Sequence, residues 1–128
     1  MGPLTLNRLI TENGAMEIQK VTSVFPVGDL AGAIRIWSSI FGIAPTFVDG
    51  DRWAQFDVCG HRVALAGSDR AFDVPGLMIK VLDLASSAKH MADMGFNVSP
   101  PQEGPHEIRC SVETRSGSAL VLYAAKGS

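Results

Sequence analysis

Two stretches of this chain, separated by a little under half its length, carry the same short motifs in the same order. A period this long that occurs only twice indicates a duplicated module rather than an array of small repeats. Each module must then fold by the same plan, which constrains the architecture more than any single motif does. The matching pairs are Val27-Gly28-Asp29-Leu30 with Val81-Leu82-Asp83-Leu84, Phe41-Gly42-Ile43 with Met94-Gly95-Phe96, and Gly60 with Gly117.

The first copy of the repeat predicts a strand, a helix and three further strands. Residues 21–27 alternate in polarity and include β-branched side chains, which is typical of a strand. Asp29 stands where a helix N-cap is expected, and Gly42 stands where a left-handed residue would end the helix. The apolar helix face consists of Leu30, Ala33, Ile34, Trp37, Ile40 and Phe41, and the later strands are expected near residues 46–48, 53–58 and 62–65.

The second copy repeats the scheme. Residues 77–81 read as a strand, Asp83 as a helix cap and Gly95 as the helix stop, and the proline-rich residues 100–105 read as a loop. The helix face consists of Leu84, Ala88, Met91 and Met94, and the later strands lie near residues 96–99, 108–112 and 119–123. We therefore predict an α+β fold with two βαβββ modules. The predicted organisation is an N-terminal extension over 1–15 and a single domain over 16–126, with modules at 17–67 and 76–125.

The order of motifs resembles the vicinal oxygen chelate superfamily, which includes glyoxalases, bleomycin resistance proteins and extradiol dioxygenases. The resemblance covers nearly the whole chain from residue 17 to residue 126. It implies that the strands of both modules form a curved, U-shaped mixed sheet, with helices on the outer face and a ligand in the concave groove. Besides the repeated motifs, it is carried by Arg52-Trp53-Ala54-Gln55-Phe56, Gly60-His61-Arg62-Val63-Ala64-Leu65 and Ser116-Gly117-Ser118-Ala119-Leu120.

The resemblance also implies a divalent metal in that groove, held by His, Glu or Gln at four strand positions. Counted from the motifs, these positions hold Thr22, Ala64, Gly76 and Val121. None of the four offers a side chain that ordinarily holds such a metal. We therefore expect no metal and no other cofactor, and the alternative is a ligand set at positions that the motifs do not indicate.

Strand alternation assigns one set of side chains to the groove. The set mixes aromatic and apolar groups with cations, as small-molecule sites do. The alternative is an ordinary solvated sheet face, on which Asp57, Glu107 and Glu113 neutralise the cations. The predicted ligand-binding residues are Thr22, Trp53, Gln55, Arg62, Met78, Lys80, Arg109, Ser111 and Tyr123.

These features favour a metal-free small-molecule binding protein of the glyoxalase and bleomycin-resistance type, with a groove suited to an aromatic or anionic ligand. The alternative is an enzyme of the same superfamily, a lyase, isomerase or dioxygenase-like protein, either metal-free or with unrecognised metal ligands. Whether the chain is an enzyme stays open, and no catalytic residue is assigned. His106, next to Glu107, is the one histidine placed for acid–base work, because His61 and His90 read as surface residues.

Charge and hydropathy limit the partners. The net charge is −2 and no Lys/Arg cluster is present, so we expect no nucleic acid. No apolar run approaches the roughly 20 residues that span a bilayer, and no export signal is apparent, so a cytoplasmic location with reduced Cys59 and Cys110 is expected. Exposed sheet edges favour a homodimer. Residues 1–15, with Leu4, Leu6, Leu9 and Ile10, would pack on the partner or form a disordered tail.

Overall fold

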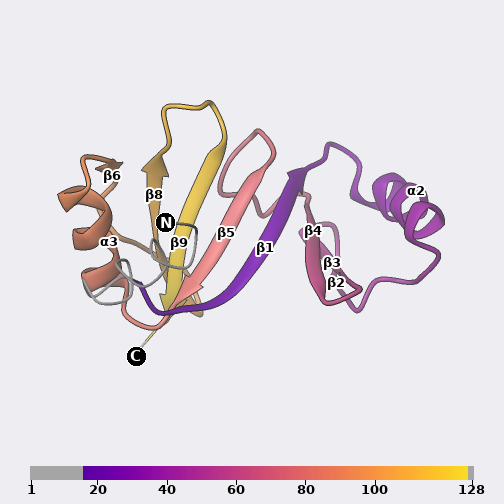
Figure 1. The fold of residues 1–128 in the computed structure, drawn as a ribbon. Coiled ribbons are helices and arrows are strands. Elements are labelled where there is room, and N and C mark those ends of the chain that lie inside the picture. Colours follow the sequence, from indigo (N-terminus) through magenta and orange to yellow (C-terminus); the bar gives the residue numbers. More distant parts are fainter. Residues whose placement is uncertain (1–15, 127–128) are drawn as a thin grey trace, which may run out of the picture. The chain divides into compact units, whose positions relative to one another are not determined.

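The computed structural model describes residues 16–126, so the predicted extension over 1–15 lies outside the described residues. The described chain forms nine strands and two helices, with both parallel and antiparallel strand pairs, which confirms the predicted α+β class and mixed sheet (Figure 1). Its contacts define a first unit over 21–78 and 115–119, and a second unit over the remaining described residues. Neither helix is long and apolar enough to cross a membrane.

The first unit follows the predicted order of one strand, one helix and three strands. Its strands lie side by side in the order β2-β3-β4-β1, with β1 parallel to β4 and the other neighbours antiparallel. A parallel first and last strand needs a long crossover between them, and the helix and two strands supply it. The elements are β1 (Ile18–Pro26), α2 (Leu30–Phe41), β2 (Phe47–Asp49), β3 (Trp53–Val58) and β4 (His61–Ala66).

Both predicted ends of α2 are confirmed. The Asp29 carboxylate accepts a hydrogen bond from the Gly32 backbone N–H at 3.1 Å. At the other end Gly42 has φ 71°, and its N–H donates to the Ser38 carbonyl at 2.8 Å. The predicted apolar face is correct except for Ile40, which is 62% exposed. Each residue turns an α-helix by about 100°, so Ile40, ten residues after Leu30, points roughly 80° away from the direction of the buried Leu30.

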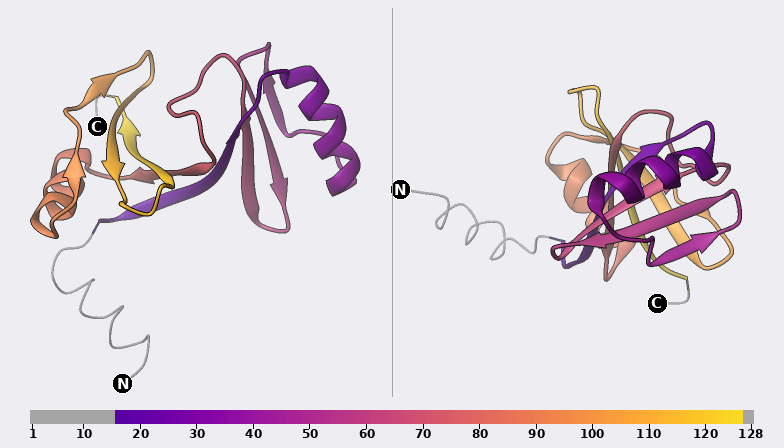
Figure 2. Two further views of the ribbon diagram at one scale, coloured as in Figure 1. Left: turned by 90° about the horizontal axis from the view of Figure 1, so that it is seen from above. Right: turned by 90° about the vertical axis from the view of Figure 1, so that its right-hand side faces the viewer.

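Helix α2 covers one face of β3 and β4 (Figure 2). Aromatic rings dominate the core between the helix and these strands. Phe25 stacks on Trp37 with ring centroids 5.5 Å apart, and Trp37 lies 5.4 Å from Phe41. Phe41 meets Phe56 edge-on at 5.3 Å. Ala54, Phe56 and Leu65 are fully buried under the helix.

The second unit repeats the order with one additional short strand. Its strands lie in the order β5-β9-β8-β6, and β7 also pairs with β8. The prediction of an uninterrupted loop over 100–105 was therefore wrong, because the two residues that follow the Pro100-Pro101 pair have free N–H groups and pair with β8. The elements are β5 (Gly76–Val81), α3 (Leu84–Asp93), β6 (Asn97–Val98), β7 (Gln102–Glu103), β8 (Glu107–Glu113) and β9 (Ala119–Ala125). The first residues of β5, up to Met78, and the first residue of β9 are counted with the first unit.

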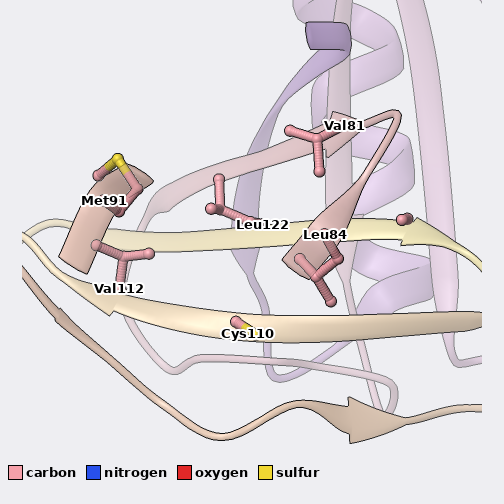
Figure 3. Close-up of a cluster of buried hydrophobic side chains, with 7 residues drawn as sticks. Val81, Leu84, Met91, Cys110, Val112 and Leu122 are labelled. Carbon is pink, nitrogen blue, oxygen red and sulfur yellow. The ribbon is translucent and has the colours of Figure 1, made fainter. Parts of the chain in front are cut away.

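Helix α3 is capped as predicted and covers an aliphatic core. The Asp83 carboxylate accepts from the Ser86 N–H at 3.2 Å, and Gly95 adopts φ 96° just beyond the helix. Met94, predicted on the buried face, is 59% exposed because the helix has already ended. Ser87 is buried instead, and its hydroxyl donates to the Asp83 carbonyl at 2.7 Å. The buried cluster consists of Val81, Leu84, Met91, Cys110, Val112, Leu122 and Ala124 (Figure 3).

Candidate functional site

The sheet face of the first unit opposite α2 carries the best-connected candidate residues. Because Ala54 and Phe56 pack under α2, alternation along β3 places Trp53, Gln55 and Asp57 on the other face. The register pairs Asp57 with Arg62 on β4. It also pairs Arg62 with Thr22 on β1. We call Thr22, Trp53, Gln55, Asp57 and Arg62 the polar face.

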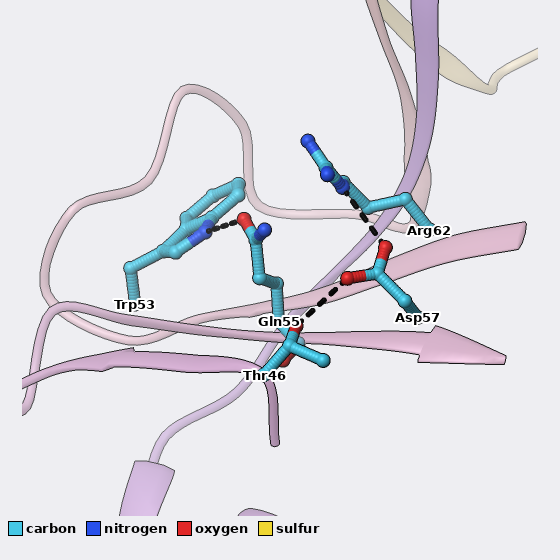
Figure 4. Close-up of polar contacts among 5 residues, drawn as sticks. All are labelled: Thr46, Trp53, Gln55, Asp57 and Arg62. Atoms are coloured by element: carbon cyan, nitrogen blue, oxygen red, sulfur yellow. Dashed lines mark hydrogen bonds and ion pairs between the residues drawn. The ribbon is translucent and has the colours of Figure 1, made fainter.

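Trp53 and Gln55 hold each other in place on this face. The indole Nε1–H of Trp53 donates to the Gln55 Oε1 atom at 3.3 Å (Figure 4). Both residues are half-buried. An indole nitrogen can only donate, so it fixes which end of the Gln55 amide faces Trp53.

Arg62 is held by an acidic partner on the neighbouring strand. Its Nε atom lies 3.3 Å from Asp57 Oδ1, and the Thr46 hydroxyl donates to Asp57 Oδ2 at 2.9 Å. The Arg62 side chain is 30% exposed and that of Asp57 is 44% exposed, so the pair itself adds little to folding stability. Its effect is to orient the guanidinium.

Two of the predicted ligand-binding residues in the first unit are buried. Thr22 is 4% exposed on β1, and Met78 is 7% exposed on β5. Leu77, at the start of the predicted strand over 77–81, is 38% exposed, whereas Val81 at its end is buried. Leu77 is the second residue of β5, where the strand has only begun.

The remaining predicted residues belong to the second unit, on β5, β8 and β9. Arg109 Nη1 lies 3.7 Å from Glu107 Oε1, so an acid two residues away neutralises it. The Ser111 backbone N–H donates to the Ser99 hydroxyl at 2.8 Å. The Lys80 side chain is half-buried, and its ammonium forms no hydrogen bond or ion pair with residues 16–126. Tyr123 is half-buried as well. Glu113 accepts from the Asn97 amide at 3.2 Å rather than from Lys80.

Two residues that hold Arg62 in place, Asp57 and Thr46, were not among the predicted ligand-binding residues. Asp57 was expected on this face as a neutralising acid, and its place two residues after Gln55 was the signal that identified it. Thr46 lies just before β2. Its backbone N–H donates to the Gln55 carbonyl at 2.9 Å, and its hydroxyl donates to the Asp57 carboxylate. Nothing local in the sequence indicates this contact.

A surface cavity of about 510 Å³ lies in the second unit, at the start of α3 and the end of β9. Leu82, Leu84 and Ile108 are among the apolar residues that line it. At its edge the Lys126 ammonium lies 3.5 Å from the Glu103 carboxylate. The sequence did not predict this cavity, because its walls come from segments that are far apart along the chain.

The residues at the four implied metal positions do not fit a metal. Within residues 16–126 no three His, Cys, Asp or Glu side chains converge. Gly76 also has no room for a ligand side chain, because a Cβ there would lie 2.4 Å from the Ala119 carbonyl oxygen and 2.7 Å from the Ala119 Cβ. Replacing this glycine with a metal ligand would require the backbone to move.

Within residues 16–126, no histidine or cysteine side chain forms a hydrogen bond that would pair a nucleophile with a base. His61 and His106 are exposed, and His90 lies half-buried on α3. The His106 carbonyl accepts from the Lys126 backbone N–H at 3.0 Å, which is a structural contact. Burial raises the pKa of the Cys110 thiol, so this residue is an unreactive part of the core.

The two βαβββ modules have the fold that the motif order predicted, that of the vicinal oxygen chelate superfamily. Several solved structures share this fold. One is an NAD-dependent benzaldehyde dehydrogenase from Legionella pneumophila, with 14% identity and a TM-score of 0.75 over 83% of this chain and 99% of that one. Another is a methylmalonyl-CoA epimerase from Streptomyces coelicolor, with 13% identity and a TM-score of 0.63 over 88% and 100%.

A third similar structure is a glyoxalase/bleomycin resistance protein/dioxygenase superfamily member from Vibrio splendidus. It has 11% identity and a TM-score of 0.63 over 84% of this chain and 98% of that one. No family model matches the sequence, and no curated protein matches it. Identities this low show a shared fold, and they leave the activity to be argued from the site.

Proposed function

We propose that this chain binds a small molecule without a metal, and that the ligand has an aromatic or anionic character. The observation that carries the proposal is the polar face, where Trp53 and Arg62 are each fixed by a hydrogen-bonded neighbour. Side chains that are held before binding lose little conformational entropy when a ligand arrives. A half-buried indole provides a surface for an aromatic body.

The misfit at the metal positions supports binding without a metal. Gly76 has no space for a ligand side chain, and Ala64 is fully buried and apolar. The other predicted ligand-binding residues, Met78, Lys80, Arg109, Ser111 and Tyr123, stay part of the proposal. Among them Lys80 is the cation without an acidic partner in residues 16–126.

An enzyme of this fold is the second candidate. It is favoured by the similar structures, which include a methylmalonyl-CoA epimerase in complex with methylmalonyl-CoA. We therefore include thioesters of carboxylic acids among the compounds to test. Turnover of any bound compound, with loss of activity on replacing His106 or Glu107, would favour the enzyme over the binding protein.

Location and assembly complete the proposal. We propose a cytoplasmic homodimer whose domain comprises residues 16–126, after an extension over 1–15. The exposed edge strand β2 supports association, because Phe47 and Val48 are 52% and 46% exposed on it. Light scattering on the full chain and on a form without residues 1–14 tests both parts, and two monomers would contradict them.

The two tryptophans provide a direct test of the binding face. Trp53 lies on the polar face, whereas Trp37 lies between Phe25 and Phe41 under α2. Compounds that raise Tm in a screen of aromatic acids, thioesters and natural products are titrated by fluorescence against Trp37→Phe and Trp53→Phe. Quenching in Trp37→Phe and none in Trp53→Phe is expected. Binding that quenches neither protein would contradict a site at this face.

A further inference from the structure

We infer that Gln55 and Arg62 form a subsite for a carboxylate, and that the polar face selects ligands that accept hydrogen bonds. This inference rests on the proposed function and names the ligand class for the same site. It comes from the direction of two hydrogen bonds. One hydrogen bond occupies the oxygen of Gln55 and the other occupies Nε of Arg62, so the remaining nitrogens of both side chains can contact a ligand.

Gln55 turns its amide donors away from Trp53, where a ligand can accept from them. Its Oε1 atom is occupied by the Trp53 indole N–H, which has no acceptor to offer in return. The amide nitrogen therefore lies on the side away from Trp53, as Figure 4 shows. That nitrogen donates to no residue between 16 and 126.

Arg62 presents only donors. Asp57 takes up its Nε edge, and no other group in the described chain accepts from the guanidinium. The terminal nitrogens lie on the side away from Asp57 (Figure 4). Two parallel N–H groups on a planar fork match the two oxygens of a carboxylate. Thr46 and Asp57 are positioning residues here, because they hold the fork without reaching the ligand.

The register places the two donors at a usable separation. Gln55 is paired with Ala64 across the β3–β4 hairpin, and Arg62 is two residues from Ala64 on the same face. Such diagonal neighbours lie roughly 7–8 Å apart, within reach of long side chains. A carboxylate bridging them would leave its aromatic body beside Trp53, on the other side of Gln55.

The test uses three probes with one ring system and different end groups: 2-naphthoate, 2-naphthamide and 2-naphthylmethylammonium. Calorimetry on the wild-type protein should show the acid binding about ten- to a hundred-fold more tightly than the amide, since charged hydrogen bonds are lost. The ammonium compound should bind least. Equal affinities for all three probes would overturn the inference and leave the proposed function standing. No binding by any probe would overturn both.

Gln55→Glu is the sharpest variant, because it keeps the shape and the acceptor for Trp53 but replaces the free donors with a carboxylate oxygen. It should abolish naphthoate binding and make the ammonium probe the preferred one. Arg62→Gln should remove the preference for acid over amide and serves if Gln55→Glu does not fold. The matched control is Arg52→Gln, an exposed arginine beside Asp49 and Asp69, which should leave all three affinities unchanged. Retained acid preference in both site variants would overturn the assignment.

Discussion

The two units share an order of elements but not the chemistry of their cores. The first core is built from rings, with Phe25, Trp37, Phe41 and Phe56 in successive contact under α2. The second is aliphatic and contains sulfur, with Met91 and Cys110 under α3. One backbone plan thus accepts two packings, because binary pattern selects the plan while side-chain volume fills it.

The sheet faces opposite the two helices differ in how their polar side chains are held. In the first unit Trp53 donates to Gln55 and Arg62 donates to Asp57, so these four side chains are held in pairs. In the second unit Arg109 has an acid at 3.7 Å and Lys80 has no partner in residues 16–126. The polar side chains held by hydrogen-bonded neighbours therefore lie in the first unit, whereas the Lys80 side chain in the second unit is less restricted.

Replacing a ring in the aromatic core should have the largest effect. Phe56 is fully buried and meets Phe41 edge-on. Phe56→Ala should lower the free energy of unfolding by about 3–5 kcal/mol, from lost burial and the cavity left behind. Denaturant titration followed by tryptophan fluorescence measures the change. Ile40→Ala, on the exposed side of the same core helix, is the control and should stay within about 0.5 kcal/mol. Equal losses in the two variants would contradict the core assigned here.

The second prediction compares the equivalent positions at the start of each module. Thr22 carries a side chain, whereas a Cβ at Gly76 would lie 2.4 Å from the Ala119 carbonyl oxygen. Gly76→Ala should therefore destabilise the protein by about 1–3 kcal/mol, as overpacking does. Thermal unfolding measures it, with Gly28→Ala as the control, because nothing lies within 4 Å of a Cβ there. A neutral Gly76→Ala would show that the backbone can open, and a metal-ligand side chain at this position would then be possible.

The turns between the last two strands of each module provide a smaller effect. Cys59 has φ 50° and precedes Gly60 at φ 82°, a two-residue hairpin turn that favours Asn-Gly. The longer turn between β8 and β9 also contains a residue with positive φ, Arg115 at 66°. Cys59→Asn should raise the free energy of unfolding by about 0.5–1 kcal/mol, because Asn tolerates the left-handed conformation better. Cys59→Val, β-branched at the same position, should lower it. A gain in Cys59→Val would contradict the assigned turn.

Local rules predicted most of the fold. Asp29, Asp83, Gly42 and Gly95 each act within one helix end, so the sequence alone indicates what they do. The predicted helix faces were wrong only at Ile40, which lies to one side of the buried line on α2, and at Met94, which lies beyond the end of α3. Strand β7 was missed because its pairing with β8 outweighs the adjoining prolines.

The candidate site was less predictable than the fold. Alternation placed Trp53, Gln55 and Arg62 on one face, because that rule needs only the strand and its buried side. The direction of the Gln55 amide and the contact between Thr46 and Asp57 depend on residues that meet only in the folded sheet. The same holds for the second-unit cavity beside Leu82 and Lys126.

The smallest effect concerns the two cysteines, one in each unit. Cys59 is exposed and Cys110 is buried, and burial raises the pKa of the Cys110 thiol above its ordinary value of 9.0. Above about pH 9 the unfolded chain loses this proton while the folded chain keeps it, so stability falls as pH rises through that range. Cys110→Ala should be less stable at neutral pH, from lost packing, but should lose less further stability between pH 8 and pH 10 than the wild type. Denaturant titrations at both pH values measure the two losses, and Cys59→Ala should retain the wild-type alkaline loss. Equal alkaline losses in Cys110→Ala and the wild type would show that the Cys110 thiol does not cause the pH dependence.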